Sequence, residues 1–182
     1  MPNKIEACSL AGPKRIHYFD GRFLSAEDLR TEQDYLIGKH RQLARAALGV
    51  GILEGLVVSG GTGGLTVSPG LALDGLGRLI ELPGACSCAL PGRTGAWDVS
   101  IGLVEEPCDP VPKVPPGPND EDGFQPSMIQ DIVKVWIEEA EASSGRPGTD
   151  GAVWLGRLRV TKRSVRVDGA PRRRPRLRAG VG

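Results

Sequence analysis

Four groups of residues have types and spacings that could support catalysis or binding. They are two closely spaced cysteines, a glycine-rich run, an acidic cluster and an arginine-rich end. Cys86 and Cys88 flank a single serine, whereas zinc-binding pairs usually leave two to four residues between their cysteines. The two histidines, His17 and His40, lie far from this pair in the sequence. The spacing therefore favours two small side chains in a strand or turn over a metal or redox site, and we predict no metal ion and no cofactor.

The glycine-rich run at residues 60–64 reads GGTGG. A phosphate-binding P-loop needs a lysine and a serine or threonine directly after its last glycine, but Leu65 follows here. A flexible hairpin loop explains the run better. Two histidines also offer no convincing nucleophile and base pair, so we predict no catalytic residue and a protein that is not an enzyme.

The acidic cluster begins with Glu27 and Asp28, at the start of a predicted helix where the helix dipole favours acids. We interpret it as a solvated helix face or a subunit contact. The basic end of the chain could contact phosphates, but no aromatic residue is interleaved for base stacking. An acidic protein surface is therefore favoured over nucleic acid as its partner. Its arginines are Arg172, Arg173, Arg174, Arg176 and Arg178.

The bulk composition favours a single β-rich domain. The 182 residues include 26 glycines and 15 prolines, with only 4% aromatic residues, a mixture typical of many short strands joined by tight turns. The net charge of +1 gives no global signal for nucleic acid or membrane. Neither a signal-peptide pattern nor an apolar run of membrane-spanning length is present, so we expect synthesis in the cytoplasm with reduced thiols.

One amphipathic helix is predicted at residues 26–48. Ser25 is a good N-cap and Asp28 stands three residues later, as in a capping box. Leu29, Leu36 and Leu43 recur at intervals of seven on one broad face. Gly49 is a natural end for this helix.

The remainder of the chain predicts an antiparallel β-sandwich or barrel. We expect strands at residues 52–58, 65–67, 71–73, 78–82, 97–104, 129–137 and 152–160. Loops are expected at residues 105–125, which are rich in proline and acid, and at residues 138–150. The domain prediction is an irregular lead-in at residues 1–14, the helix and sandwich at 15–168, and a basic, flexible tail at 169–182.

Several segments together resemble the opening of bacterial proteins encoded beside phage-tail-like genes. They are YFDGRFLSAEDL at residues 18–29, EQDY at 32–35, GVGILEGL at 49–56, LTVSPGLALDGLGRLI at 65–80, EEPCDPVP at 105–112 and QPS at 125–127. The helix followed by a glycine-bounded strand is also loosely similar to the start of the type VI secretion baseplate adaptor, which resembles the shoulder of phage receptor-binding proteins. Family members are often longer than this chain.

The resemblance implies a structural or adaptor component of a contractile injection particle, near its baseplate or fibres. It implies contacts with baseplate, spike or fibre subunits, a homo-oligomer within the assembly, and incorporation in a particle or virion that is released from the cell. We expect contact residues near the helix start and in the tail. The candidates at the helix start are Tyr18, Phe19, Asp20, Arg22, Glu27 and Asp28, beside the five arginines already named.

The main alternative is a β-sandwich module that binds carbohydrate or another ligand. Such a module needs exposed aromatic side chains that converge on one cleft. Trp97, Trp136 and Trp154 are the candidates, and all three lie in predicted strands, where packing in the core explains them more simply.

Overall fold

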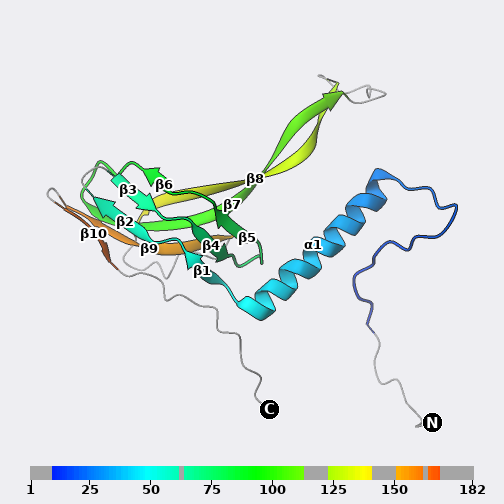
Figure 1. The fold of residues 1–182 in the computed structure, drawn as a ribbon, viewed down its shortest axis with the longest axis horizontal. Helices are drawn as coiled ribbons and strands as arrows, with labels where there is room; N and C mark the ends of the chain where they lie inside the picture. Colours follow the sequence, from blue (N-terminus) through cyan, green and yellow to red (C-terminus); the bar gives the residue numbers. More distant parts are fainter. Residues whose placement is uncertain (1–9, 62–63, 113–122, 141–150, 162–163, 169–182) are drawn as a thin grey trace, which may run out of the picture. The chain divides into compact units, whose positions relative to one another are not determined.

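The structure is a computed structural model that describes residues 10–61, 64–112, 123–140, 151–161 and 164–168. Within these ranges, one α-helix precedes ten β-strands arranged in three antiparallel sheets (Figure 1). This confirms the expected mainly β fold with one N-terminal helix. The chain divides into two units, Met1–Leu43 and Ala44–Gly182, which are described separately.

The helix α1 spans Ala26–Leu48, as the sequence predicts. It ends where the Gly49 N–H donates to the Arg45 carbonyl over 3.1 Å and Gly49 adopts a φ of 74°, a left-handed conformation that favours glycine. None of its residues is buried. The predicted seven-residue leucine spacing therefore lies on a helix in which no residue is buried.

Two three-stranded sheets form one layer of the sandwich. The first has the order β1-β4-β5, and the second has the order β2-β3-β6. Their strands are β1 (Gly51–Gly55), β2 (Val58–Gly61), β3 (Gly64–Val67), β4 (Gly70–Leu73), β5 (Leu79–Leu82) and β6 (Cys86–Cys88).

The third sheet has four strands in the order β10-β9-β7-β8. They are β7 (Gly95–Pro112), β8 (Phe124–Glu139), β9 (Ala152–Val160) and β10 (Val165–Asp168). Apolar side chains of all three sheets meet in one buried cluster. Leu65, Val67 and Ile80 enter it from the short sheets, and Val99, Ile101 and Leu158 from the long one.

The single strand expected at residues 52–58 is wrong, because two strands of different sheets replace it. Leu56 breaks the run with a φ of 53°, a left-handed conformation that a non-glycine residue seldom adopts. Its N–H donates to the Pro69 carbonyl over 3.2 Å instead of continuing the strand. Leu56 remains buried, so packing of its side chain is compatible with the unusual backbone.

The loop expected at residues 105–125 is also wrong in part. Strand β7 continues to Pro112 and β8 already begins at Phe124, with pairs such as Pro107 opposite Ile129 and Pro112 opposite Phe124. Proline is tolerated at a sheet edge, where its missing N–H is not needed. Residues 113–122, and residues 141–150 of the second expected loop, lie outside the described part of the chain.

The strands expected at residues 65–67, 71–73 and 78–82 correspond to β3, β4 and β5, whereas β6 was expected only as a strand or turn. Strand β9 has the predicted bounds, and the predicted turn at residues 74–77 is organised by Asp74. The buried Asp74 carboxylate accepts the backbone N–H groups of Leu76 and Arg78 at 2.9 and 2.8 Å, and the Arg78 Nε at 2.7 Å. Strand β10 is an element that the pattern did not predict.

Candidate functional site

The start of α1 is fixed by a reciprocal capping box. The Ser25 N–H and Oγ–H donate to Asp28 Oδ2 over 3.0 and 2.8 Å, and the Asp28 N–H donates to Ser25 Oγ over 3.1 Å. These bonds, led by the one from the Ser25 backbone, lower the pKa of Asp28, and Arg22 lowers it further. Asp28 is therefore a structural carboxylate that defines where the helix begins.

The segment before the helix folds back on its first turns. Residues 19–22 form a tight turn in which the Arg22 N–H donates to the Phe19 carbonyl over 3.1 Å. Arg22 also pairs with Asp28 at 2.8 Å and lies over the Phe19 ring at 5.9 Å. The Tyr18 hydroxyl donates to the Glu32 carboxylate. The structure thus brings together most of the contact residues predicted near the helix start.

Of these predicted residues, Tyr18, Phe19, Asp20 and Glu27 are exposed, whereas Arg22 and Asp28 are half-buried in the arrangement just described. A contact role for any of them stays a prediction. The five arginines of the tail lie outside the described residues. The leucine stripe of α1 lies beside this cluster, with Leu29, Leu36 and Leu43 exposed by 55%, 49% and 66%.

A second exposed surface is the outer end of the β7–β8 hairpin, here called the arm (residues 105–112 of β7 and 124–131 of β8). Strand β9 pairs with β7 only as far as Gly102, so the arm is a two-stranded ribbon that projects beyond the four-stranded part of its sheet (Figure 1). Its large apolar side chains include Phe124 and Met128, which are 54% and 62% exposed. The sequence pattern missed this surface, because proline and acid in residues 105–125 indicate a loop.

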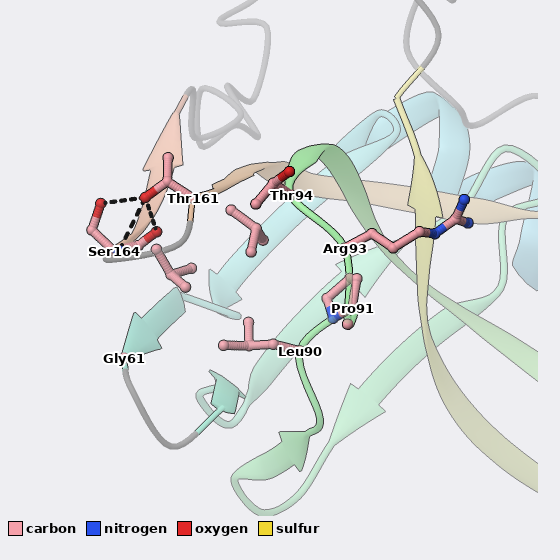
Figure 2. Close-up of a pocket in the computed structure, with 10 residues that line it drawn as sticks. Gly61, Leu90, Pro91, Arg93, Thr94, Thr161 and Ser164 are labelled. Atoms are coloured by element: carbon pink, nitrogen blue, oxygen red, sulfur yellow. Dashed lines mark hydrogen bonds between the residues drawn. The ribbon is translucent and has the colours of Figure 1, made fainter.

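A hollow of about 970 Å³ lies near the start of β7, and the turn before β7, the end of β9 and the start of β10 line it (Figure 2). Leu90, Pro91, Val160 and Val165 supply apolar lining. The Thr161 hydroxyl donates to the Ser164 carbonyl over 2.9 Å at its polar side. Its size is that of a pocket for a small molecule or for a few side chains.

Close packing of β2 against β10 shapes this hollow. A side chain at Gly60 would place its Cβ 2.7 Å from Val165 Cγ1, so only glycine allows the two strands this approach. The glycine-rich run therefore has a packing role in part, which the sequence could not reveal because the contact joins residues more than a hundred positions apart.

The two cysteines of β6 lie on one side of the strand. Cys86 and Cys88 are half-buried while Ser87 is exposed, which confirms the prediction of small strand residues with one side buried. Their sulfur atoms are 3.9 Å apart, well beyond the length of a disulfide bond. Burial raises the pKa of the Cys88 thiol, and the neighbouring Cys86 thiol raises it further, so this thiol keeps its proton at neutral pH.

The three tryptophans do not gather around the hollow. Trp97 is buried, Trp136 packs over Gly102, and the Trp154 indole N–H donates to Asp98 over 3.0 Å. None of them is among the residues that line the hollow. The described residues therefore offer no aromatic cleft in support of a carbohydrate-binding module.

Within the described residues, no three His, Cys, Asp or Glu side chains are grouped so that they could hold a metal ion. In the same part of the chain, no helix has the length and apolar character needed to cross a membrane.

Solved structures that are similar to this chain include the following two. One, described as "Crystal structure of TssK", matches with a TM-score of 0.48 and 14% identity, over 86% of this chain and 41% of that one. The other, "The baseplate complex from the type VI secretion system", matches with a TM-score of 0.41 and 12% identity, over 87% of this chain and 58% of that one. The chain thus spans less than two thirds of either. No family model and no curated protein matches its sequence.

Proposed function

We propose that this protein is a structural adaptor of a phage-tail-like contractile injection particle, placed near the baseplate or the fibre attachment region. The observation that carries the proposal is the amount of apolar surface that the fold leaves open on two extended elements, α1 and the arm. Large exposed apolar surfaces on a folded protein mark sites of protein contact. The order of sequence motifs that resembles proteins encoded beside phage-tail-like genes supports the choice of particle.

In this proposal, the protein functions through the contacts that its surfaces make with other subunits. The sandwich is a rigid support, and α1 and the arm present side chains to neighbouring subunits of the baseplate, spike or fibre. In this view the protein is made in the cytoplasm and is incorporated into the particle there. The arginines at the end of the chain add a basic segment that suits an acidic neighbour.

Co-sedimentation with particles tests this function. Cells that carry the gene and its neighbours are lysed, and particles are pelleted and separated on a density gradient. We expect the protein to peak with sheath and tube proteins, and a Phe124→Ser, Met128→Ser variant to shift toward the soluble fraction. The matched control is Leu79→Ser, which removes an apolar side chain that is similarly exposed on β5. A wild-type protein that stays soluble while particles pellet normally would contradict the proposal.

A further inference from the structure

The two cysteines of β6 hold their sulfur atoms closer together than the strand holds their backbones. Residues two apart in an extended strand are separated by about 6.6 Å along the chain. The sulfur atoms of Cys86 and Cys88 lie only 3.9 Å apart, so the two thiols turn toward each other. Ser87 between them is exposed, whereas both cysteines are half-buried. Strand β6 thus presents a pair of thiols, here called the dithiol, on one side.

Strand β3 fixes the position of the dithiol. In the β3–β6 register, Cys88 lies opposite Leu65 and Cys86 lies opposite Val67, and both of these partners are fully buried. A Cβ at Gly64 would lie 2.9 Å from the Cys88 carbonyl oxygen, so glycine is what lets the two strands approach this closely. The dithiol therefore stands beside the apolar core on a backbone that its neighbouring strand holds in place.

The dithiol can be reached from solvent. Strand β6 is the edge strand of the sheet β2-β3-β6, and neither cysteine is fully buried. A depression of about 370 Å³, lined by residues of β2, β3 and β6, includes Cys88. An ion therefore has a path to this thiol that requires no strand to move.

The sulfur separation fits a bridging metal ion better than a disulfide bond. A disulfide bond is about 2.05 Å long, so the two sulfur atoms would have to approach by about 2 Å. Residues two apart in a strand also lie near the upper limit of about 6.8 Å between the Cα atoms of a disulfide. Two metal–sulfur bonds of about 2.3 Å at a tetrahedral angle, by contrast, span about 3.8 Å. The dithiol matches this span as it stands.

The number of ligands decides which metal suits the dithiol. Thiolates are soft ligands that favour monovalent copper and zinc. Zinc sites in proteins use three or four protein ligands, and among the described residues no third His, Cys, Asp or Glu is grouped with this pair. Monovalent copper is stable with two thiolates alone, and its shorter bonds open the angle between the two sulfur atoms. The dithiol is therefore a better match for copper than for zinc.

We propose that Cys86 and Cys88 form a binding site for one monovalent copper ion. Each Sγ atom forms one bond to the ion, and each thiol releases its proton to solvent. No electron is transferred, so the copper stays monovalent and neither sulfur atom is oxidised. The site departs from the sequence expectation of no metal ion, which was based on the spacing of zinc ligands. It is independent of the proposed adaptor function, which depends on α1 and the arm.

Competition with a coloured chelator of monovalent copper tests the site. The purified full chain is kept reduced and free of oxygen. A Cys8→Ser, Cys108→Ser variant retains only the β6 pair among the four cysteines, and it serves as the parent. Cys86→Ser and Cys88→Ala are then added to this parent one at a time, and circular dichroism melts identify the variants that remain folded. X-ray absorption counts the sulfur atoms bonded to copper.

We expect the wild type and the parent each to retain one copper ion per chain against the chelator, with two copper–sulfur bonds. Each folded β6 variant should lose this copper, and either variant decides the question if the other does not fold. Loss of copper from the parent, or copper retained by a folded β6 variant, would overturn the proposal. So would a parent that retains zinc but not copper after dialysis.

Discussion

Asp98 on β7 and Arg157 on β9 form a two-bond ion pair at the edge of the core. Arg157 Nε donates to Asp98 Oδ1 over 2.9 Å and Nη2 donates to Oδ2 over 2.8 Å, while Trp154 donates to Oδ1 as well. The two residues face each other in the β7–β9 register. This pair links β7 to β9 near the start of β7, the strand whose far end forms part of the arm.

Removal of the Asp98 carboxylate should therefore destabilise the fold. We expect Asp98→Ala to cost about 3 kcal/mol, because it leaves the Arg157 and Trp154 donors without their acceptor, and Asp98→Asn to cost about 1–2 kcal/mol. The control is Asp168→Asn, which removes the exposed Arg159–Asp168 pair and should cost less than about 1 kcal/mol. Urea unfolding at pH 7 measures all three. An equal loss for Asp98→Asn and Asp168→Asn would contradict this account.

The same pair predicts a pH dependence. The Arg157 guanidinium, with help from Trp154, holds the pKa of Asp98 below its ordinary value. A carboxyl whose pKa is lower in the folded state stabilises the fold above its unfolded pKa of about 3.9. That contribution is lost as the pH falls through the folded pKa. We expect the wild type to lose its stability advantage over Asp98→Asn below about pH 4, as measured by urea midpoints at several pH values; an advantage that grows at acid pH would have the wrong sign.

Two tryptophans offer a matched comparison of hydrogen bonding. The Trp154 N–H has Asp98 as its acceptor, whereas the buried Trp97 N–H has no partner among the described residues. Both Trp→Phe changes remove a similar ring volume. Trp154→Phe also removes a bond to a charged group, worth about 1.5–3 kcal/mol, whereas Trp97→Phe removes an unpaired donor. Thermal unfolding should show the larger loss for Trp154→Phe, and the reverse order would contradict the hydrogen-bond assignment.

The capping box predicts a titration change at the helix start. Ser25→Ala removes the hydroxyl that bonds Asp28 and the acceptor for the Asp28 N–H. We expect the pKa of Asp28 to rise toward its ordinary value and the first turn of α1 to fray. Carboxyl-carbon NMR titration measures the pKa, and amide exchange in residues 26–29 measures the fraying. Ser25→Asp, which retains a capping oxygen, should preserve slow exchange; unchanged exchange in Ser25→Ala would count against the cap.

The close contact between β1 and β4 requires glycine at position 70. A Cβ at Gly70 would lie 2.3 Å from the Glu54 carbonyl oxygen and 2.5 Å from the Leu56 nitrogen, and backbone atoms cannot move aside cheaply. We expect Gly70→Ala to cost about 3 kcal/mol. Gly84→Ala is the control, because its Cβ would meet nothing within 4 Å. Similar melting temperatures for the two variants would show that the strands do not approach this closely.

Local signals in the sequence determined α1, β9 and the turn at Asp74. A helix with a capping residue, a seven-residue leucine spacing and a terminal glycine depends on neighbours along the chain, so its bounds can be read from residue types. The same holds for a short turn in which an aspartate accepts nearby backbone N–H groups.

Only the tertiary structure decided the break at Leu56, the length of β7 and β8, and the position of the hollow. Each depends on partners distant in sequence: Pro69 redirects the Leu56 N–H, and residues 124–131 pair with a proline-rich segment. Val165 meets Gly60 across two sheets. Pairing between strands satisfies backbone groups wherever the register brings them together, and this overrides the local preference of proline and glycine for loops. The arm and the hollow therefore became visible as candidate surfaces only in three dimensions.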